Sequence, residues 1–341
     1  PEQREQMRLL TNPTGKRGSP LDFVGAWFLK AGAYAQGRNI PFGFVCTNSL
    51  TQGEQVALLW PRLFDEYKLE IAFAHRTFAW GSEARGKANV HVVVLGLEPR
   101  AHARKVKRLF SYTDIKGEPE ESQHGAISPY LFDAGGLGNP HMVVSDSRKP
   151  ISDRPRMYNG PKSTDGGHYI FRVEQIDEFI TAEPKAKKFM RHYIGAAEFL
   201  NNKRREILFL ADAPPADLKS MPLVMERIAL VKQFRTESKK PATQKLAYYP
   251  TLLEGKTIPD QPFLAIPQVS SERREYVPFG WVEPPTIPSD KLRYIADITK
   301  PEFAILTSAM HMAWMRTVTG RMKSDYMYSV GVVYNTFPLP K

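Results

Sequence analysis

Small polar side chains gather where an apolar run of the sequence ends. The stretch Phe42 to Thr47 predicts a buried strand, and Asn48 and Ser49 follow it directly. In an open α/β sheet, amides and hydroxyls at the carboxyl end of a strand are placed to contact a ligand. The same residue types cap helices, and Ser49 or Thr51 could cap the helix predicted to follow. From the residues alone, Thr47, Asn48 and Ser49 form either a pocket wall or a helix cap.

Cations and aromatic rings alternate around the end of a second predicted strand. This combination suits a nucleotide, because cations can hold its phosphate while a ring stacks on its base. The competing interpretation is that the rings belong to the core and that Arg76 forms a surface ion pair. The residues concerned are His75, Arg76, Phe78, Trp80, Arg85 and Lys87.

A third group lies near the carboxyl end. Arg321, Lys323 and Asp325 alternate after a helix that stops at Gly320, so an extended segment would place their side chains on one face. A lysine can donate to guanine and an aspartate can accept from cytosine N4, so Lys323 and Asp325 could read one G·C pair. The competing interpretation is an exposed salt bridge, which would contribute little to stability.

The net charge predicts a polyanionic partner, although a generic basic protein is the alternative. Lysine and arginine number 47 against 36 acidic residues, which gives +11. Neutralising phosphates releases counterions and so favours binding to nucleic acid. Candidate contacts to the DNA backbone are Arg104, Lys105, Lys107, Arg108, Arg273, Arg274 and Arg316, and ion pairs within the protein are the other interpretation. A basic run in one predicted helix, as a phosphate track or a solvated face, comprises Lys185, Lys187, Lys188, Arg191 and His192.

The overall composition is that of a globular protein large enough for two domains. Of the 341 residues, 42% are hydrophobic and 24% are charged. No apolar run approaches the ~18 residues of a membrane span. Cys46 is the single cysteine, so we expect no intrachain disulfide, no metal cluster and a cytoplasmic location.

The order of predicted elements indicates two parts. The first part reads as helix, strand, helix, strand, strand, which is typical of half of a doubly wound α/β sheet. The second part mixes helices and strands without βα alternation and is therefore predicted as α+β, with a boundary near residue 115. The first part has helices at 21–36 and 53–65 and strands at 42–47, 70–74 and 90–97. The second has helices at 216–239 and 301–318 and strands at 263–266 and 328–333.

Several long segments resemble the MmeI-like restriction–modification proteins of the type IIL/IIG kind. They include "FVCTNSLTQGEQVALLWP", "FAHRTFAWGSEARGKANVHVVVLGL", "EPKAKKFMRHYIGAAEFLN", "PQVSSERREYVPFGW" and "VVYNTFPLP", and the resemblance extends over essentially the whole chain. It implies a partial Rossmann-like methyltransferase sheet at 1–115, of the gamma class, followed by an α+β target-recognition domain at 116–341. It also implies adenine-N6 methylation of double-stranded DNA with S-adenosylmethionine.

The resemblance further implies a division of labour within a longer protein. In the family, a glycine-rich strand end binds the cofactor, an Asn-Pro-Pro-Phe motif holds the flipped adenine, and a nuclease that would use Mg²⁺ precedes both. Neither motif occurs here. The Asn-Pro pairs are Asn12-Pro13 and Asn139-Pro140, and they are followed by threonine and histidine rather than by Pro-Phe. Because the chain begins with Pro1, we expect these parts upstream and predict that this fragment alone is inactive.

Residue roles follow from the same resemblance. Thr47, Asn48 and Ser49 become the wall of the target-base pocket, Trp80 or Phe78 the stacking ring, and Lys323 with Asp325 the readers of one base pair. The alternatives are a non-catalytic DNA-binding specificity module and, from the sheet pattern alone, a metabolic Rossmann-type enzyme. The sequence does not predict an oligomeric state.

Overall fold

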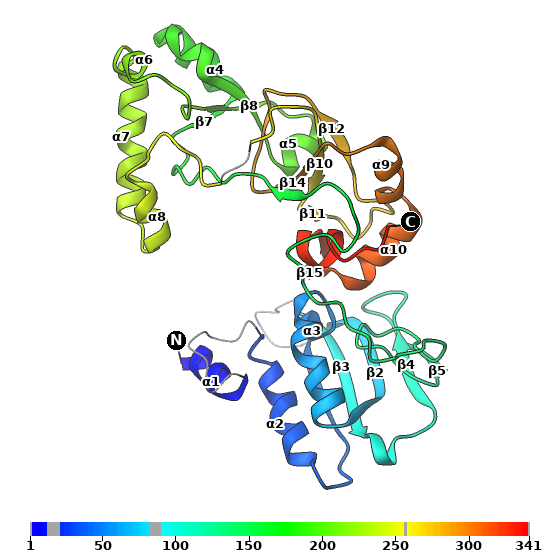
Figure 1. Ribbon diagram of the computed structural model, residues 1–341. Helices are drawn as coiled ribbons and strands as arrows, with labels where there is room; N and C mark the ends of the chain where they lie inside the picture. The colour runs from blue at the N-terminus through cyan, green and yellow to red at the C-terminus, as the bar shows by residue number, and fades with distance from the viewer. Residues whose placement is uncertain (1, 12–20, 82–89, 256–257, 340–341) are drawn as a thin grey trace. The chain divides into compact units, whose positions relative to one another are not determined.

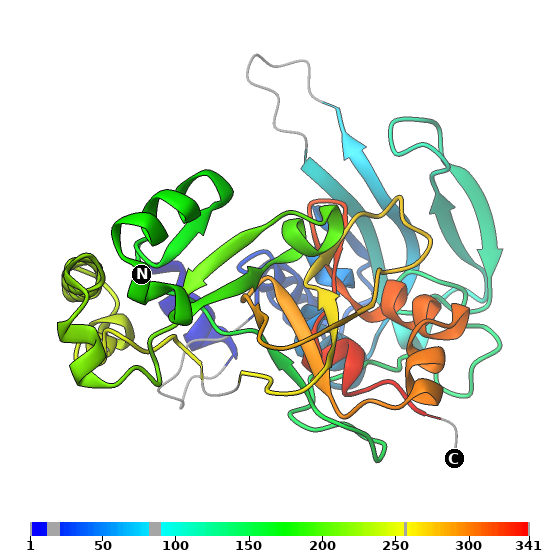
Figure 2. The same ribbon diagram turned by 90° about the horizontal axis from the view of Figure 1, so that it is seen from above.

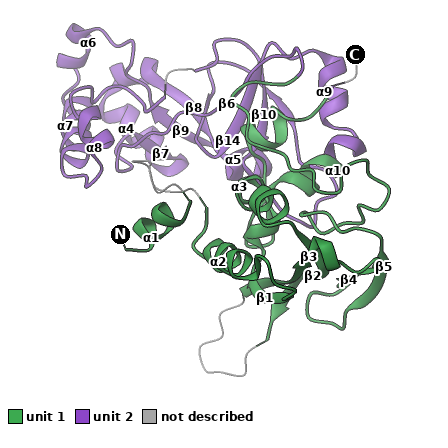
Figure 3. Ribbon diagram, turned by 60° about the horizontal axis from the view of Figure 1, so that its bottom comes forward, with its two compact units in different colours: residues 1–151, 313–338 green, residues 152–312, 339–341 purple. Residues whose placement is uncertain are grey.

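The computed structural model describes residues 2–11, 21–81, 90–255 and 258–339 (Figure 1). The chain forms two compact units, shown in Figure 3. Unit 1 comprises Pro1–Ile151 and Ala313–Pro338, and unit 2 comprises Ser152–Met312 and Leu339–Lys341. The boundary between the two units follows Ile151 rather than residue 115. Residues 313–338, close to the carboxyl end, pack with the amino-terminal part. The functional domains 1–115 and 116–341 stay a prediction, since packing alone does not define them.

Unit 1 contains a five-stranded sheet, several helices and a short hairpin. Its helices are α1 (Glu2–Thr11), α2 (Gly25–Ala35), α3 (Glu54–Pro61), the 3₁₀ turns η1 (Asn48–Thr51) and η3 (Arg100–His102), and the π-helical turns η2 (Arg62–Glu66) and η5 (Val330–Tyr334). Its strands are β1 (Phe42–Thr47), β2 (Leu69–Trp80), β3 (Val90–Pro99), β4 (Lys107–Ser111), β5 (Glu120–His124), β15 (Gly320–Met322) and β16 (Asp325–Met327). Helix α10 (Ala309–Val318) belongs in part to each unit.

The five strands run in the order β1-β3-β2-β4-β5. Neighbours pair antiparallel except β2 and β4, which are parallel. Figure 2 shows β2 and β3 beside the β4–β5 pair. The predicted mixed α/β class is confirmed, but β3 lies antiparallel between β1 and β2, so this sheet is mixed rather than purely parallel.

Helices α2 and α3 cover one face of this sheet (Figure 1). Phe44 of β1 meets Phe28 of α2 edge-on at 5.0 Å between ring centroids, and Trp60 of α3 is fully buried in the same core. β3 is buried along most of its length, as its β-branched run predicts. This core fixes the sheet whose opposite face carries the candidate site.

Unit 2 contains two four-stranded sheets, with orders β12-β10-β14-β6 and β13-β8-β9-β7. The strands are β6 (Met157–Asn159), β7 (Ile170–Arg172), β8 (Met190–Ile194), β9 (Arg205–Leu208), β10 (Phe263–Pro267), β11 (Val269–Ser270), β12 (Gly280–Val282), β13 (Ile287–Pro288) and β14 (Leu292–Ala296). The helices are α4 (Val173–Ala182), η4 (Pro184–Phe189), α5 (Ala196–Asn201), α6 (Pro215–Lys219), α7 (Pro222–Thr236), α8 (Pro241–Leu246) and α9 (Lys300–Leu306). This mixture is the predicted α+β class.

Four sequence predictions for this half are wrong in their details. The helix expected at 216–239 is broken before Pro222, because proline lacks an N–H and disfavours helical geometry in the preceding residue. The helix expected at 301–318 is interrupted where Ser308 Oγ accepts from His311 N at 3.2 Å and starts a new helix. The run 328–333 is mostly the buried turn η5 rather than a strand, and the basic run from Lys185 lies in η4 and β8 rather than in one helix.

Candidate nucleic-acid interface

Strand pairing places two of the predicted site segments in one row across the sheet. Thr47 of β1 lies opposite Val92 of β3, and Val92 lies opposite Phe78 of β2. Paired residues point to the same face, so Thr47 and Phe78 share a face and lie roughly 10 Å apart, which is two strand spacings. The same face exposes Gly43 and Val45 of β1, an edge strand among the described residues. The sheet therefore brings the polar strand end and the aromatic segment together.

The residues after β1 form a 3₁₀ turn with its own hydrogen bonds. Thr47 Oγ1 and Ser49 Oγ lie 3.0 Å apart, and Thr51 Oγ1 donates to the Asn48 carbonyl at 3.0 Å. Helix α3 begins after Gly53 and has no side-chain cap, so Ser49 and Thr51 do not cap it. The Nδ2 of Asn48 is enclosed and has no hydrogen-bond partner in the part of the chain that the structure describes. An enclosed donor of this kind is available to a ligand.

A cavity of about 340 Å³ in unit 1 joins this turn to the hairpin β15–β16. Asn48, Ser49 and Gln52 line one part of it, and Gly320 and Arg321 line another. The backbones approach closely at Gly53, where an added Cβ would lie 3.1 Å from Gly320. Two segments about 270 residues apart in the sequence therefore build a single pocket that carries polar groups from both.

The predicted DNA-reading residues lie on a hairpin rather than on one face of an extended segment. Met322 pairs with Asp325, and Lys323 occupies the turn with φ 58°. This left-handed conformation costs a non-glycine residue about 1 kcal/mol. Lys323 is exposed and Asp325 is partly buried. Tight reversal of the chain brings Lys323 and Asp325 to the same hairpin tip.

Arg321 is held within the hairpin. Its guanidinium lies over the ring of Tyr326, with Cζ 4.3 Å from the ring centroid, and its Nη1 donates to the Ser324 carbonyl at 2.9 Å. These contacts orient the cation beside the pocket wall, where it can meet an anionic group.

One predicted DNA contact is wrong. Lys107 is only 4% exposed, and its Nζ donates to Glu98 Oε1 at 2.8 Å. A buried and paired ammonium cannot reach a phosphate, so Lys107 stabilises the protein interior. The neighbouring Lys105 is exposed.

The other basic residues near the sheet have protein partners. Arg104 pairs with Glu98 at 3.2 Å, and Arg108 makes two hydrogen bonds to Glu121 at 2.8 and 2.7 Å. Arg76 Nε donates to the Leu131 carbonyl at 2.7 Å. Their roles as DNA contacts stay predictions, and each would have to share its guanidinium with these partners.

The remaining predicted DNA contacts are distributed along the chain. Arg85 and Lys87 lie outside the described residues. Arg273 and Arg274 are exposed in a turn of unit 2, whereas Arg316 is partly buried in α10. The structure does not test their contact with DNA.

Sequence reasoning missed the surroundings of the predicted stacking rings. Phe78 and Trp80 lie within β2, which continues beyond the strand end predicted at residue 74, and Trp80 is 47% exposed. Phe78 stacks on Tyr112 with ring centroids 4.9 Å apart, and His75 Nδ1 lies 2.8 Å from the Tyr112 hydroxyl. Burial, together with the nearby Arg108, lowers the pKa of His75 and so favours its neutral ring. The aromatic residues around 110 were the available signal.

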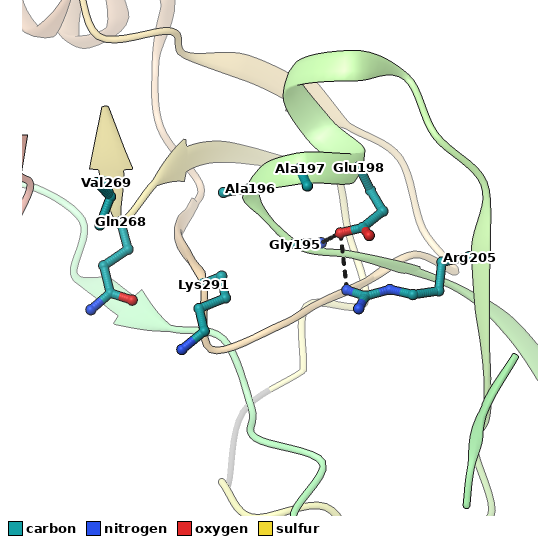
Figure 4. A pocket seen from close by; sticks show the side chains of 8 residues that line it. All are labelled: Gly195, Ala196, Ala197, Glu198, Arg205, Gln268, Val269 and Lys291. Atoms are coloured by element: carbon teal, nitrogen blue, oxygen red, sulfur yellow. Dashed lines mark hydrogen bonds and ion pairs between the residues drawn. The ribbon is translucent and has the colours of Figure 1, made fainter. Parts of the chain in front are cut away.

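Unit 2 has a separate cavity of about 310 Å³, shown in Figure 4. Glu198 accepts from the Gly195 amide at 2.8 Å and from Arg205 Nη2 at 3.0 Å. The Nε of Arg205 is enclosed and has no hydrogen-bond partner among the residues described. Gln268 and Lys291 lie on another part of the lining (Figure 4).

The described residues include no clustered metal ligands, and their cysteine, Cys46, is buried. Within the described ranges, no group of three or more His, Cys, Asp or Glu side chains is arranged to hold a metal ion. Burial raises the pKa of the Cys46 thiol to about 12, which makes it a poor nucleophile at neutral pH. Among the described helices, none has the length and apolar character of a membrane-spanning segment.

Comparison with known proteins places these features in a family. The family model "MmeI, DNA-methyltransferase domain" matches residues 1–111, and "MmeI, target recognition domain" matches residues 138–341. "DNA methyltransferase A" of Bacillus subtilis (strain 168) is 37% identical over 326 residues, which are 96% of this chain and 36% of that protein.

A solved structure agrees with these matches. The type IIL restriction–modification enzyme MmeI in complex with DNA is 39% identical and superimposes with a TM-score of 0.93. The alignment covers 100% of this chain and 44% of that chain, so this sequence spans less than half the length of either relative. The chain belongs to the MmeI family, and it carries regions that match both the DNA-methyltransferase domain and the target-recognition domain of that family.

Proposed function

We propose that this chain is the carboxyl part of the methyltransferase domain, together with the target-recognition domain, of a bifunctional restriction–modification enzyme. The full-length protein binds duplex DNA in the cytoplasm and transfers a methyl group from S-adenosylmethionine to N6 of one flipped adenine. The observation that carries this proposal is the pocket in which Asn48 and Ser49 at the strand end meet Arg321 of the hairpin.

Methylation of adenine N6 requires that the nucleotide leave the duplex stack. It does not require a strongly basic catalytic side chain. An adenine amino group becomes accessible only when the nucleotide leaves the stack and enters a protein pocket. Asn48 and Ser49 offer polar groups to the edge of the adenine, and an aromatic ring of β2 stacks on its face. The rate enhancement then comes chiefly from orientation of the amino nitrogen toward the methyl group.

The cofactor is assigned to residues outside this chain. The glycine-rich strand end and the Asn-Pro-Pro-Phe motif are absent from the sequence. We therefore assign no cofactor contact to the described residues. The Mg²⁺-dependent nuclease that the resemblance implies is likewise expected upstream.

DNA recognition is assigned to the hairpin and to the basic residues. Lys323 and Asp325 at the hairpin tip read one G·C pair, while Lys105, Arg273 and Arg274, which are exposed, contact phosphates. Arg321 lines the pocket itself and is placed to hold the backbone beside the flipped nucleotide.

A non-catalytic DNA-binding module is the second candidate, because the two catalytic motifs are missing from this sequence. The deciding experiment incubates the full-length protein with duplex DNA and labelled S-adenosylmethionine, and then digests the DNA to nucleosides. The proposal predicts label in N6-methyladenine and none when the 341-residue chain is used alone. Salt-dependent DNA binding without any labelled nucleoside would establish the binding module instead.

A further inference from the structure

Five aromatic rings form a continuous ladder on the face of the sheet opposite α2 and α3. His75, Phe78 and Trp80 come from β2, Phe110 comes from β4, and Tyr112 directly follows β4. His75 stacks flat on Phe110, with ring centroids 4.2 Å apart and an interplanar angle of 6°. Phe78 stacks on Tyr112 at 4.9 Å and 20°. Trp80 meets Phe78 at 6.2 Å and a tilt of 49°, a looser contact than either stack.

A β-bulge places these rings on the same face. His75 and Phe78 are three residues apart, so a regular strand would point them to opposite faces. The register between β2 and β3 shifts between these residues, with Val94 opposite His75 and Val92 opposite Phe78. The extra residue of the bulge turns Phe78 and Trp80 back to the face of His75. Bulges commonly re-aim side chains next to active sites.

Polar contacts at Tyr112 and at Arg108 hold the ladder in place. The Tyr112 hydroxyl lies 2.8 Å from His75 Nδ1, which fixes a ring that otherwise extends beyond the end of β4. Arg108 lies over the other end of the ladder, with its Cζ 5.0 Å from the centroid of Phe110. Its paired hydrogen bonds to Glu121 join this end to β5. A chain of contacts therefore connects β5, through the residues in and directly after β4, to the ring of Phe78.

We propose that Tyr112, held by His75, is a positioning residue that fixes the ring of Phe78 for stacking on the flipped base, and that Phe78 rather than Trp80 is the stacking ring. This inference rests on the proposed function. Phe78 lies in the same row of paired residues as Thr47, and Thr47 directly precedes the polar turn. The ring of Phe78 is stacked on Tyr112, whereas Trp80 is 47% exposed and meets Phe78 at a tilt of 49°. A pre-positioned ring loses less side-chain entropy when the base arrives.

A double-mutant cycle in the full-length protein tests this coupling. Single-turnover methyl transfer at saturating DNA and S-adenosylmethionine is measured for the parent, Tyr112→Ala, Phe78→Ala and the double variant. Because Tyr112 acts through Phe78, Tyr112→Ala should slow transfer about tenfold in the parent and less than about twofold in the Phe78→Ala background. Equal effects of Tyr112→Ala in both backgrounds would overturn the proposal.

Further variants separate positioning from a general structural role. Tyr112→Phe keeps the stacking ring and should recover transfer to within about threefold of the parent. The Kd for DNA should change less than about threefold in every variant, because only base orientation is lost. If Tyr112→Ala does not fold, Tyr112→Leu replaces it in the cycle.

Tyr248→Ala, which removes a ring that is 83% exposed in unit 2, is the matched control and should leave transfer unchanged. A larger loss for Trp80→Ala than for Phe78→Ala also overturns the proposal.

A spectroscopic readout distinguishes failure of this inference from failure of the proposed function. If the unsubstituted full-length protein transfers no methyl group, the proposed function is refuted. The stack is then judged from 2-aminopurine placed at the target position, whose fluorescence is quenched by stacking on a ring. Tyr112→Ala should brighten the bound probe as Phe78→Ala does, and unchanged brightness in Tyr112→Ala contradicts the positioning role.

Discussion

Two lysines in the same basic cluster have opposite surroundings and should respond differently to substitution. Lys107 is buried against Glu98, which is itself 5% exposed, whereas Lys105 is exposed. Lys107→Met removes the buried partner of the Glu98 carboxylate, which keeps its pairing with Arg104, and should cost about 2 kcal/mol in the free energy of unfolding. Lys105→Gln should leave stability unchanged and reduce the salt slope of DNA binding by about 1. Denaturant unfolding and binding over a salt series measure both effects, and wild-type stability of Lys107→Met would contradict the assignment.

A buried histidine in unit 2 should make stability depend on pH. His311 is fully buried, and its burial together with Arg154 lowers its pKa from 6.5 to about 3. Below pH 6.5 the unfolded chain binds a proton that the folded protein excludes, so stability should fall as the pH falls. The contribution is about 1.4 kcal/mol per pH unit until the folded pKa is reached. Comparing unfolding between pH 5 and 6.5, His311→Gln should lack this slope, while the exposed His192→Gln should retain it.

The hairpin tip carries a prediction about sequence specificity. Exchanging charges with Lys323→Glu and Asp325→Arg should reverse the preferred base pair at one position of the site, because donor and acceptor change places. Discrimination of one base pair is worth about 1–3 kcal/mol, so the original site should be methylated roughly tenfold or more slowly. Mapping of methylated positions in DNA exposed to full-length protein provides the measurement. An unchanged pattern would exclude this pair as base readers.

At the scale of elements, one glycine joins the polar turn to the hairpin. Gly53 has φ 57°, and a Cβ there would lie 3.1 Å from Gly320, whereas Gly37 has φ 69° with no atom within 4 Å. Both alanine variants carry the cost of a positive φ, about 1 kcal/mol, and Gly53→Ala costs more because a ψ of −146° lies in a region essentially restricted to glycine. Only Gly53→Ala must also displace the hairpin, so it should lose at least about 1 kcal/mol more than Gly37→Ala. Equal losses in denaturant unfolding would show that the contact with Gly320 does not hold the hairpin.

Local elements were largely predictable, and their pairing was not. Hydrophobic spacing located α2, α3, β1 and β3, since each buries an apolar face. The same spacing continued across Pro222, where backbone chemistry ends one helix and starts another. It also cannot show the bulge in β2, because register depends on the neighbouring strand.

The candidate site illustrates the same limit. Residue types identified Asn48, Phe78 and Lys323, but their grouping depends on contacts between distant segments. Nothing local indicates that the turn after β1 and the hairpin near residue 323 line one cavity. The wrong prediction for Lys107 has a similar origin, because its partner Glu98 becomes a neighbour only when β3 and β4 are placed in the sheet.

For the whole molecule, we propose that this chain supplies DNA recognition and one side of the base pocket, and that the cofactor site lies in another part of a longer protein. The most direct test is a structure of the full-length protein bound to duplex DNA containing its site, with an unreactive analogue of S-adenosylmethionine. We predict an extrahelical adenine with its face within about 4 Å of the Phe78 ring and its edge contacted by Asn48 or Ser49. A target adenine that remains stacked in the duplex, or one that is bound away from β1 and β2, would contradict the account.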